Sequence, residues 1–470
     1  MVNDFFILMK QELVIFAIIF ILLFIKVGSK EWKNTDIMNL VNILLGINFI
    51  VGFFGGKEGI LFNEMFITNP LLVFEKSILS FGTLIISLQS YSWLKNHKHV
   101  PEFYMLLLST LLGMFYMISS GNLLMFYLGL ELSTIPLAAL ANFDLDKRRS
   151  SEAAMKLIIS SAFSSGILLL GISFMYGTTG TLTFSELPLL ITGDSLQVFA
   201  FILLFAGFAF KISVVPFHLW TADVYEGAPV AVTSYLSVIS KGAVLFVFVS
   251  VLYKVFKPLA LTWYNMLVVL SLLTIIIGNL FALRQNNFKR FLAFSSIAQV
   301  GFILIGISGI SQIGSSSVIY FVLVYLFSNL GAFGVVSVVS ALTGKEEIDD
   351  YKGFYKTNPV LSWILTISLF SLAGVPPTAG FFGKFFLLLS GAGSNNYPLI
   401  IVAALNMVIS FYYYLRIVKA IFMDTNAQPI EKVSVPSASK LALYLCVAGV
   451  ILVGVFSGVY NSIFNLSFGF

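Results

Sequence analysis

Apolar stretches of about twenty residues recur along the whole chain, and they constrain its fold more than any other feature. As an α-helix, a stretch of this length crosses a hydrocarbon core about 30 Å thick. Charged residues make up only 10% of the 470 residues and hydrophobic residues 58%, unlike the mixture in a soluble domain. The short alternating segments of a membrane β-barrel are not evident. The sequence therefore predicts an all-α polytopic membrane protein.

The number and length of these stretches predict about fourteen transmembrane helices in a single membrane domain, residues 1–470. The first stretch resembles a signal peptide, but Lys26 ends it and no small-residue cleavage site follows, so we expect a retained helix. The expected spans are 12–27, 37–54, 70–94, 102–119, 121–141, 152–176, 195–220, 229–253, 259–283, 289–309, 312–342, 358–390 (interrupted), 396–422 and 439–460.

The loops between the spans alternate between a side of the membrane that is rich in lysine and arginine and a side that is poor in them. Cytoplasmic loops of membrane proteins carry an excess of lysine and arginine, so this bias accounts for the net charge of +5 better than nucleic-acid binding does. It also predicts that both termini lie on the non-cytoplasmic side. The rich side holds Lys26, Lys30, Lys33, Lys95, Lys98, Lys147, Arg148, Arg149, Arg284, Lys289, Arg290, Lys345, Lys352, Lys356, Lys419, Lys432 and Lys440, and the poor side Lys10, Lys57, Lys254 and Lys257.

Prolines interrupt two of the expected spans. Pro216 falls inside the seventh span, and Pro376 with Pro377 inside the twelfth. Proline removes a backbone donor and crowds the preceding helical turn. Irregular backbone at membrane depth is tolerated only beside protein or a water-filled cavity, and paired broken helices are typical of transporters.

A short repeat accompanies the two breaks. Residues 206–211 and 379–384 share the pattern A-G-F-x-x-K, each beside its prolines. In so apolar a chain the match can arise by chance, and the prolines lie on opposite sides of the two lysines. The residues alone leave internal duplication and coincidence equally open.

Several charged residues lie deep inside apolar spans. Such a charge costs about 2.5 kcal/mol or more at the bilayer centre, so it usually faces a partner or a wet cavity and marks an ion path. Glu131 is too short to reach an interface, and Lys211 and Lys241 are near the middle of their spans. Lys384 is central if its span continues through the break. For Lys156, close to the loop, snorkelling and function stay equally open.

Buried lysines suit proton transfer because burial disfavours their charged form and a nearby carboxylate favours it. We expect Glu131 and Lys211 to form a switch, Lys241 to be the central relay and Lys384 the outer group. His218 follows the first break; a relay and a structural role are equally open for it. The chain has only three histidines and one cysteine, Cys446, so we expect it to bind neither haem nor an iron–sulfur cluster. No metal site and no nucleotide-binding motif is predicted.

Three groups of motifs carry a family resemblance. They are Phe210-Lys211 through Val215-Pro216-Phe217-His218-Leu219-Trp220 to Asp223-Val224-Tyr225-Glu226-Gly227-Ala228-Pro229 and Ser240-Lys241; Gly129-Leu130-Glu131-Leu132-Ser133; and Pro376-Pro377-Thr378-Ala379-Gly380-Phe381-Phe382-Gly383-Lys384. With them, almost the whole chain resembles the antiporter-like membrane subunits of respiratory complex I, an NADH:quinone oxidoreductase.

The resemblance implies a fold of two inverted five-helix repeats with broken seventh and twelfth helices. It places three N-terminal helices in 1–100, the repeats in 101–254 and 259–423, and a C-terminal helix in 424–470. It also implies that a charged chain for proton translocation consists of Glu131, Lys156, Lys211, Lys241 and Lys384.

One position departs from the family pattern. Gln299 stands where related subunits usually have histidine, and glutamine does not take up and release a proton near neutral pH. We expect it to orient water rather than carry a proton itself.

The resemblance implies a translocase subunit that binds no cofactor itself. NADH, FMN, iron–sulfur clusters and quinone are expected in partner subunits, with neighbouring antiporter-like and small membrane subunits in a bacterial inner membrane. Quinone reduction elsewhere would drive the protons. Two alternatives remain: a subunit of a multi-subunit cation/proton antiporter, and a structural membrane scaffold.

Overall fold

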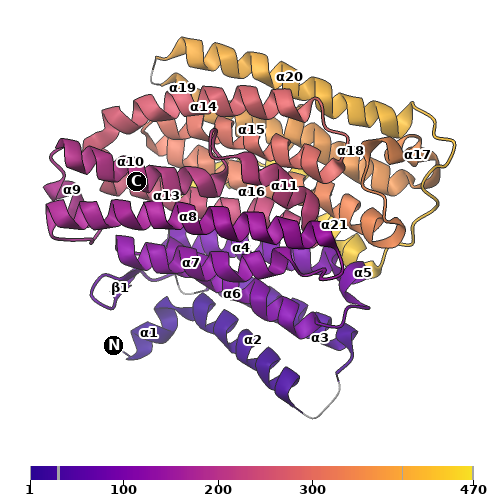
Figure 1. The fold of residues 1–470 in the computed structure, drawn as a ribbon, viewed down its shortest axis with the longest axis horizontal. Helices are drawn as coiled ribbons and strands as arrows, with labels where there is room; N and C mark the ends of the chain where they lie inside the picture. The colour runs from indigo at the N-terminus through magenta and orange to yellow at the C-terminus, as the bar shows by residue number, and fades with distance from the viewer. Residues whose placement is uncertain (1, 29–31, 55, 394, 468–470) are drawn as a thin grey trace.

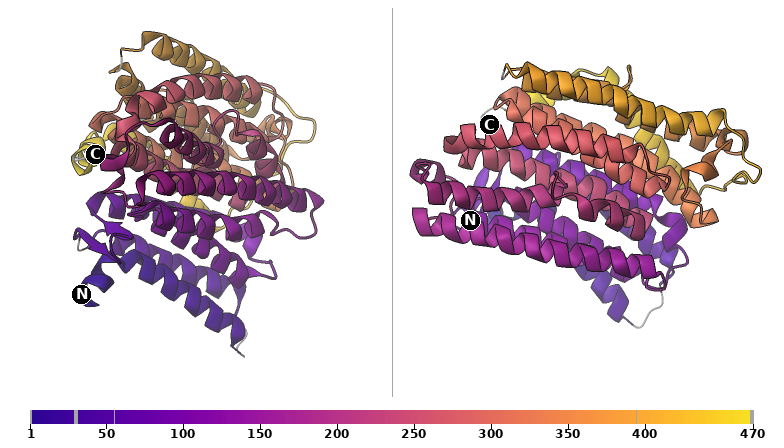
Figure 2. Two further views of the ribbon diagram at one scale, coloured as in Figure 1. Left: turned by 60° about the vertical axis from the view of Figure 1, so that its left-hand side comes forward. Right: turned by 45° about the horizontal axis from the view of Figure 1, so that its top comes forward.

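The structure, a computed structural model, describes residues 2–28, 32–54, 56–393 and 395–467. Its elements are nearly all helices that run alongside one another, as Figures 1 and 2 show. The one sheet in the described residues is a small antiparallel pair of strands, β1 (Gly59–Leu61) and β2 (Phe66–Thr68). The prediction of an all-α polytopic architecture is confirmed.

The N-terminal helices are joined by a buried ion pair. Lys76 Nζ on α4 lies 2.5 Å from Glu12 Oε1 on α2, and both side chains are almost fully enclosed. Removing either partner would leave a buried charge without compensation, so the pair ties α2 to α4. The elements here are α1 (Val2–Leu8), α2 (Lys10–Val27), α3 (Asn34–Val51), α4 (Pro70–Gln89) and α5 (Tyr91–Leu94).

The next group of helices contains the first break, between α10 and α11. A π-helical turn, η1 (Leu236–Ser240), joins α12 to α13, and a second, η2 (Val251–Val255), extends α13, so that all four form one long span. The α-helices are α6 (Val100–Ile118), α7 (Leu123–Ala141), α8 (Arg148–Thr179), α9 (Leu187–Leu190), α10 (Ser195–Ile212), α11 (Leu219–Gly227), α12 (Val230–Tyr235) and α13 (Lys241–Ser250).

The last group contains the second break, between α18 and α19. Its elements are η3 (Lys257–Leu259), α14 (Ala260–Ala282), α15 (Phe288–Ser308), α16 (Gln312–Thr343), η4 (Ile348–Tyr351), α17 (Phe354–Thr357), α18 (Pro359–Ala373), α19 (Ala379–Ala392), α20 (Tyr397–Phe422), α21 (Ser437–Val455) and α22 (Gly458–Leu466).

Side-chain caps define where several helices begin. Asn122 accepts a hydrogen bond from Met125 N at the start of α7, and Asn287 accepts one from Arg290 N at the start of α15. Such caps satisfy backbone donors that the first helical turn leaves unpaired.

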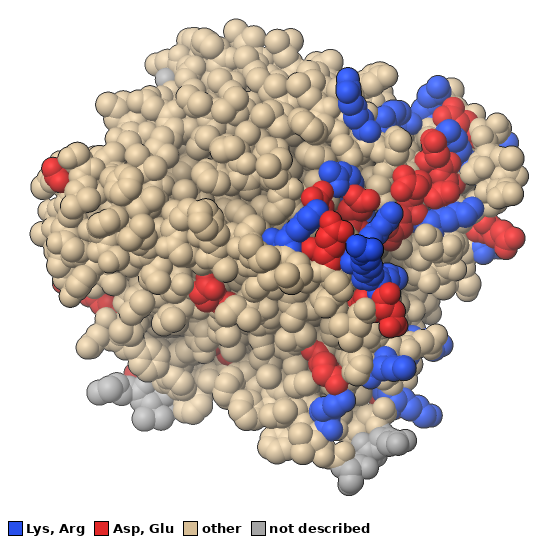
Figure 3. All heavy atoms as spheres, in the orientation of Figure 1, with Lys and Arg blue, Asp and Glu red and all other residues tan. Residues whose placement is uncertain are grey.

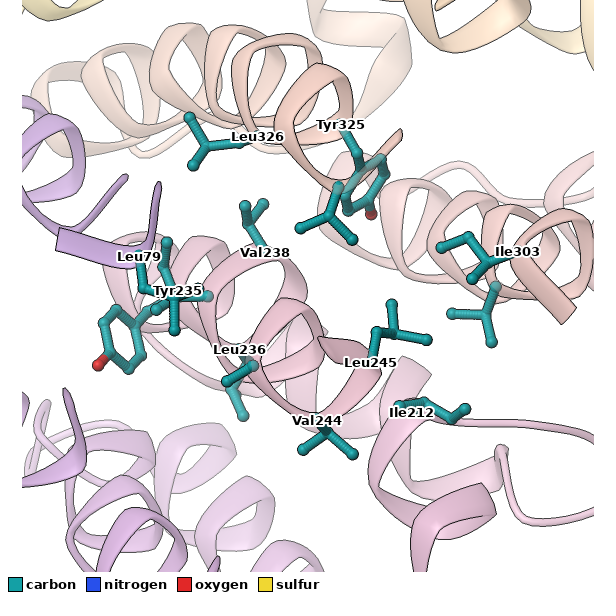
Figure 4. Close-up of a cluster of buried hydrophobic side chains, with 14 of the residues drawn as sticks. Leu79, Ile212, Tyr235, Leu236, Val238, Val244, Leu245, Ile303, Tyr325 and Leu326 are labelled. Atoms are coloured by element: carbon teal, nitrogen blue, oxygen red, sulfur yellow. The ribbon is translucent and has the colours of Figure 1, made fainter. Parts of the chain in front are cut away.

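Helices α13, α15 and α16 form the centre of the molecule. The apolar window of α15 is entirely buried and that of α16 is 94% buried, whereas that of α14 is only 39% buried. In Figure 4, Leu245 of α13, Ile303 of α15 and Leu326 of α16 contribute to one apolar cluster. The central helices therefore position side chains inside protein, and helices such as α14 present their apolar faces outward to lipid.

Twelve helices in the described residues are long and apolar enough to cross a membrane. The two expected spans outside this set correspond to α2, which carries Lys10, Glu12 and Lys26, and to the broken pair α18 and α19. The total of fourteen stays a prediction, as does the division at residues 100, 254 and 423.

Charged side chains gather at one end of the molecule, which we call the charged end (Figure 3). The N-terminal and C-terminal helices, α1 and α22, lie toward the opposite end (Figure 1). This agrees with the predicted separation of loops rich in lysine and arginine from loops poor in them. Lys30, one of the residues in that prediction, lies outside the described residues. Which end faces the cytoplasm remains a prediction from the basic residues.

Candidate proton-transfer site

The first break separates α10 from α11. Helix α10 ends at Ile212, and Ser213 adopts a left-handed conformation with φ of 66°. The expected span 195–220 is wrong at its end, because the second half-helix begins at Leu219 and continues to Gly227. Proline at 216 prevents a continuous helix, and the motif Ala228-Pro229 ends the second half. The Val215–Pro216 peptide is cis.

Lys211 lies in the last turn of α10, immediately before this break. Its ammonium donates hydrogen bonds of 2.7 Å to Thr134 Oγ1 on α7 and to Ser161 Oγ on α8. A cation at a helix C-terminus is favoured by the helix dipole. The structure therefore gives this half-buried lysine two neutral hydroxyl partners.

Glu131 lies on the same face of α7 as Thr134, three residues away. Lys211 bonds to Thr134, so the two members of the predicted switch lie near each other, but the described residues contain no direct ion pair between them. One carboxylate oxygen of Glu131 is buried without a hydrogen-bond partner.

Lys241 begins α13 and is buried, with 3% of its surface exposed. Its ammonium donates a 2.6 Å hydrogen bond to Ser296 Oγ on α15 and lies 5.4 Å from the ring centre of Tyr225. The π-helical turn η1 directly precedes it. Insertions of this kind are frequent at functional sites because they turn side chains away from the regular helical register.

His218 follows the first break and precedes α11. It is 7% exposed, and its Nδ1 atom is buried without a hydrogen-bond partner. The relay role and the structural role both stay open for it.

Gln299 lies between Lys241, with which it shares a cavity, and the second break, where it bonds to the end of α18. It lines the same small cavity as Lys241 and Ser296, with a volume of about 10 Å³, roughly the space that one water molecule needs. Its amide nitrogen donates to Leu372 O at 3.1 Å and to Tyr414 Oη at 3.3 Å, while its amide oxygen is buried without a partner.

The second break follows the predicted pattern, with α18 ending at Ala373 and α19 beginning at Ala379. Gly374 has φ of 86°, and the Pro376–Pro377 peptide is cis. Lys384 on α19 donates a 3.2 Å hydrogen bond to Ala373 O and lies 5.0 Å from the ring centre of Phe302. Gln299 and Lys384 therefore satisfy two consecutive carbonyls, those of Leu372 and Ala373, at the end of α18.

Lys156 lies apart from the buried lysines. Its side chain is 41% exposed and pairs with Glu152 at 2.9 Å and Asp223 at 2.7 Å. Asp223 also pairs with Arg290 at 2.7 Å, which in turn reaches Glu226 at 2.9 Å. This ionic cluster ties the second half of the broken helix, α11, to α8 and α15.

Sequence reasoning did not identify the neutral partners of the lysines or the members of this ionic cluster. Thr134, Ser161 and Ser296 carry no signal in the sequence, because hydroxyl residues are common in membrane helices and often bond to their own backbone. Asp223 lies inside one of the recognised motifs, but its contact with Lys156 spans 67 residues. Within the described residues, no group of three or more potential ligands could hold a metal ion.

The geometry can support proton transfer because titratable groups alternate with hydroxyl, amide and carbonyl groups. Lys211, Lys241 and Lys384 each donate to neutral oxygens, and none has a carboxylate within ion-pair distance in the described residues. A buried ammonium without a fixed counter-charge can release its proton more readily than one locked in an ion pair.

Comparison with known proteins gives a consistent result. A family model described as NADH:quinone oxidoreductase/Mrp antiporter, transmembrane, matches residues 120–410. NADH-quinone oxidoreductase subunit N of Phocaeicola vulgatus is 47% identical, covering 95% of each chain. The protein of the same name from Azobacteroides pseudotrichonymphae is 44% identical, covering 99% of this chain and 98% of its own.

Solved structures show the same architecture. A chain of respiratory complex I from Thermus thermophilus matches with a TM-score of 0.83 and 25% identity, covering 96% of this chain and 99% of its own. A chain of the Mrp complex from Dietzia sp. matches with a TM-score of 0.86 and 19% identity, covering 97% and 96%. Fold and broken helices thus define an antiporter-like membrane subunit. Within that class, the chain belongs to the family of NADH-quinone oxidoreductase subunit N.

Proposed function

We propose that this chain moves protons across the membrane as a subunit of an NADH:quinone oxidoreductase. The observation that carries the proposal is the set of three lysines within apolar helices that bond to neutral oxygens, the buried Lys241 and Lys384 and the half-buried Lys211. Enclosed charges are costly in a membrane and persist where they serve transport.

The contacts support an order for the path. Glu131 and Lys211 would form the switch in the first half, where Lys211 bonds to Thr134 on the helix that carries Glu131, and His218, which follows the first break in the chain, would pass protons toward Lys241. Lys241 shares a cavity with Gln299, which binds the carbonyl next to the one that Lys384 binds. Lys241 is therefore the centre of the path and Lys384 its outer group.

Unpartnered polar atoms mark where water would complete this path. Glu131 Oε1, His218 Nδ1, Tyr225 Oη and Gln299 Oε1 are all buried without a hydrogen-bond partner. Buried polar groups without protein partners are usually satisfied by water. Gln299 would hold such a water with its free amide oxygen instead of carrying the proton.

Lys156 would serve at the rim of the path. Its exposure and its pairing with Asp223 place it where water reaches the ionic cluster beside α11. It would collect protons at that surface rather than relay them through the interior.

The driving reaction would occur in other subunits. The relatives are named as subunits of NADH-quinone oxidoreductase, which supports the proposal that NADH, FMN, iron–sulfur clusters and quinone would bind to partner chains and that this chain would hold no redox centre. The proposed location is a bacterial inner membrane, with both termini on the non-cytoplasmic side. Its neighbours would be other antiporter-like and small membrane subunits.

Replacement of Lys241 by alanine tests the proposal. Membrane vesicles carrying Lys241→Ala should show no proton uptake attributable to this subunit on addition of NADH, while the assembled complex is recovered in normal amount. Lys257→Ala, an exposed lysine outside the path, is the matched control and should pump normally. Unchanged pumping by the Lys241 variant, with intact assembly, would remove that lysine from the path.

The cation/proton antiporter alternative rests on the fold shared with the Mrp complex chain. It predicts sodium-dependent exchange by a complex that lacks redox subunits. Gentle detergent purification distinguishes the two, because flavin and iron–sulfur subunits should co-purify with the chain if the proposal holds. A purely structural scaffold would predict that substitutions at Glu131 and Lys211 leave pumping unchanged.

A further inference from the structure

A groove at the charged end lies between the beginnings of α18 and α21. It has a volume of about 500 Å³ and is separate from the buried lysines of the proton path. We call it the α18–α21 groove. Its lining comes from residues 357–361 and 364 on one side and from residues 432–435, 440, 443 and 444 on the other.

The groove is positively charged. Lys432 and Lys440 line it, no carboxylate does, and neither lysine makes an ion pair within the described residues. The N-termini of α18 and α21 also meet here, since these helices begin at Pro359 and Ser437. Helix N-termini carry partial positive charge, which adds to that of the two ammonium groups. The occupant favoured by these charges is an anion.

The same groove has apolar walls. Leu361, Ile364 and Leu443 form buried parts of its surface, while Val360 and Tyr444 are each more than half exposed. These residues continue along two membrane helices away from the lysines. A free inorganic anion would gain nothing from this surface, whereas a molecule with an anionic head and an apolar tail would contact both parts.

Exposed aromatic residues lie near the groove in the chain. Trp363 lies in the second turn of α18 and is 51% exposed, and Tyr355 precedes the helix and is 39% exposed. Tryptophan and tyrosine gather at the membrane–water boundary, where their rings contact lipid and their polar atoms reach water. We therefore expect the lysines of the groove to lie near the depth of a phosphate group.

We propose that the α18–α21 groove binds an anionic phospholipid of the leaflet at the charged end. Its phosphate lies between Lys432, Lys440 and the two helix N-termini, and its acyl chains follow Val360, Ile364 and Tyr444. Basic pockets between membrane helices bind anionic head groups in this way. This binding site is independent of the proposed proton path.

The test uses the intact complex with Lys432→Gln and Lys440→Gln in one variant. Two lysines near a membrane surface contribute about 1 kcal/mol each, so we expect binding of phosphatidylglycerol to weaken about 30-fold. The complex is stripped of lipid in detergent, titrated with phosphatidylglycerol or phosphatidylcholine in mixed micelles, washed, and its retained lipid is measured by mass spectrometry.

Two further variants make the result decisive. Lys33→Gln with Lys356→Gln removes two exposed lysines outside the groove and should retain phosphatidylglycerol as the unmodified complex does. Lys432→Arg with Lys440→Arg keeps the charge and should also retain it. Equal phosphatidylglycerol retention by the glutamine variant would overturn the proposal. Equal loss of phosphatidylcholine, or loss of a neighbouring subunit with lipid unchanged, would overturn it as well.

Discussion

At the residue scale, the distinguishing feature of the buried lysines is the neutrality of their partners. Lys241 bonds to a serine hydroxyl and Lys384 to a backbone carbonyl, whereas Lys76 outside the path pairs with Glu12. An ion pair fixes both charges, because separating them leaves a buried charge unpaired. Neutral oxygens can bind an ammonium, and when the lysine loses its proton no unpaired carboxylate is left behind. Deprotonation therefore costs less free energy than it would in an ion pair.

The Ser296 hydroxyl should therefore matter for proton transfer through Lys241. A hydrogen bond to a charged group contributes about 1.5–3 kcal/mol, and the low end corresponds to about a tenfold change. We expect Ser296→Ala to slow NADH-driven proton uptake by about tenfold in vesicles. Ser80→Ala removes a buried hydroxyl that bonds to Asn48 in the N-terminal helices. If both variants pump equally, Ser296 has no specific part in the path.

Gln299 should act by holding its neighbours and a water molecule. Gln299→Leu removes the donor to Leu372 O and Tyr414 Oη. Tyr414 keeps its hydrogen bond with Ser295, but the buried carbonyl of Leu372 is left unsatisfied at a cost of about 1–3 kcal/mol. We expect this variant to lose most of its proton uptake, by about tenfold. Gln299→His keeps a polar group and should retain most of it. Normal pumping by the leucine variant would contradict the proposed role.

The buried lysines could be predicted because a charge within an apolar run is visible in the sequence. Their partners could not be predicted, since Thr134, Ser161 and Ser296 resemble many other hydroxyl residues in the same helices. The ion pair between Lys156 and Asp223 depends on how α8 packs against α11, which no local pattern specifies. Family resemblance singles out Lys156 but gives no information about this partner.

At the element scale, the two broken helices have similar ends. Each first half finishes in a residue with left-handed conformation, Ser213 or Gly374, and leaves backbone carbonyls that other groups satisfy. Phe210 O accepts from Trp220 Nε1 at 3.1 Å, and Ala373 O accepts from Lys384. The prolines predicted both interruptions, but not how far α11 continues beyond the first, because Gly227 allows several local conformations.

Gly374 should be intolerant of a side chain. Its φ of 86° is unfavourable for other residues, at about 1–2 kcal/mol. A Cβ atom there would also approach Lys384 Cδ at 3.2 Å. We expect Gly374→Ala to shorten the half-life of NADH-driven pumping on heating and to lower the pumping rate several-fold by displacing Lys384.

Gly166→Ala is the matched control for this substitution. Gly166 lies within α8, and a Cβ atom there would meet nothing within 4 Å. Alanine is favoured over glycine inside a helix by about 1 kcal/mol, so this variant should be as stable as the unmodified complex or more so. Equal behaviour of the two variants would show that Gly374 is not required by the break.

At the scale of the whole molecule, the charged end determines the orientation in the membrane. The sequence has more lysine and arginine in the loops of one side than in those of the other, and charged side chains gather at one end (Figure 3), which predicts that this end faces the cytoplasm. Both α1 and α22 lie toward the opposite end (Figure 1). If the orientation is correct, the proposed lipid site lies in the cytoplasmic leaflet, and Lys156 faces the compartment from which protons are taken.

Cysteine labelling can test the orientation, because the one native cysteine, Cys446, is fully buried. In a Cys446→Ala background, Lys98→Cys and Lys257→Cys place one thiol on an exposed residue at each side of the chain. A membrane-impermeant maleimide added to intact cells should label only the position 257 variant. In inside-out vesicles it should label only the position 98 variant. Because thiols react only where the reagent reaches them, the reverse pattern would invert the orientation and place Lys156 on the side where protons are released.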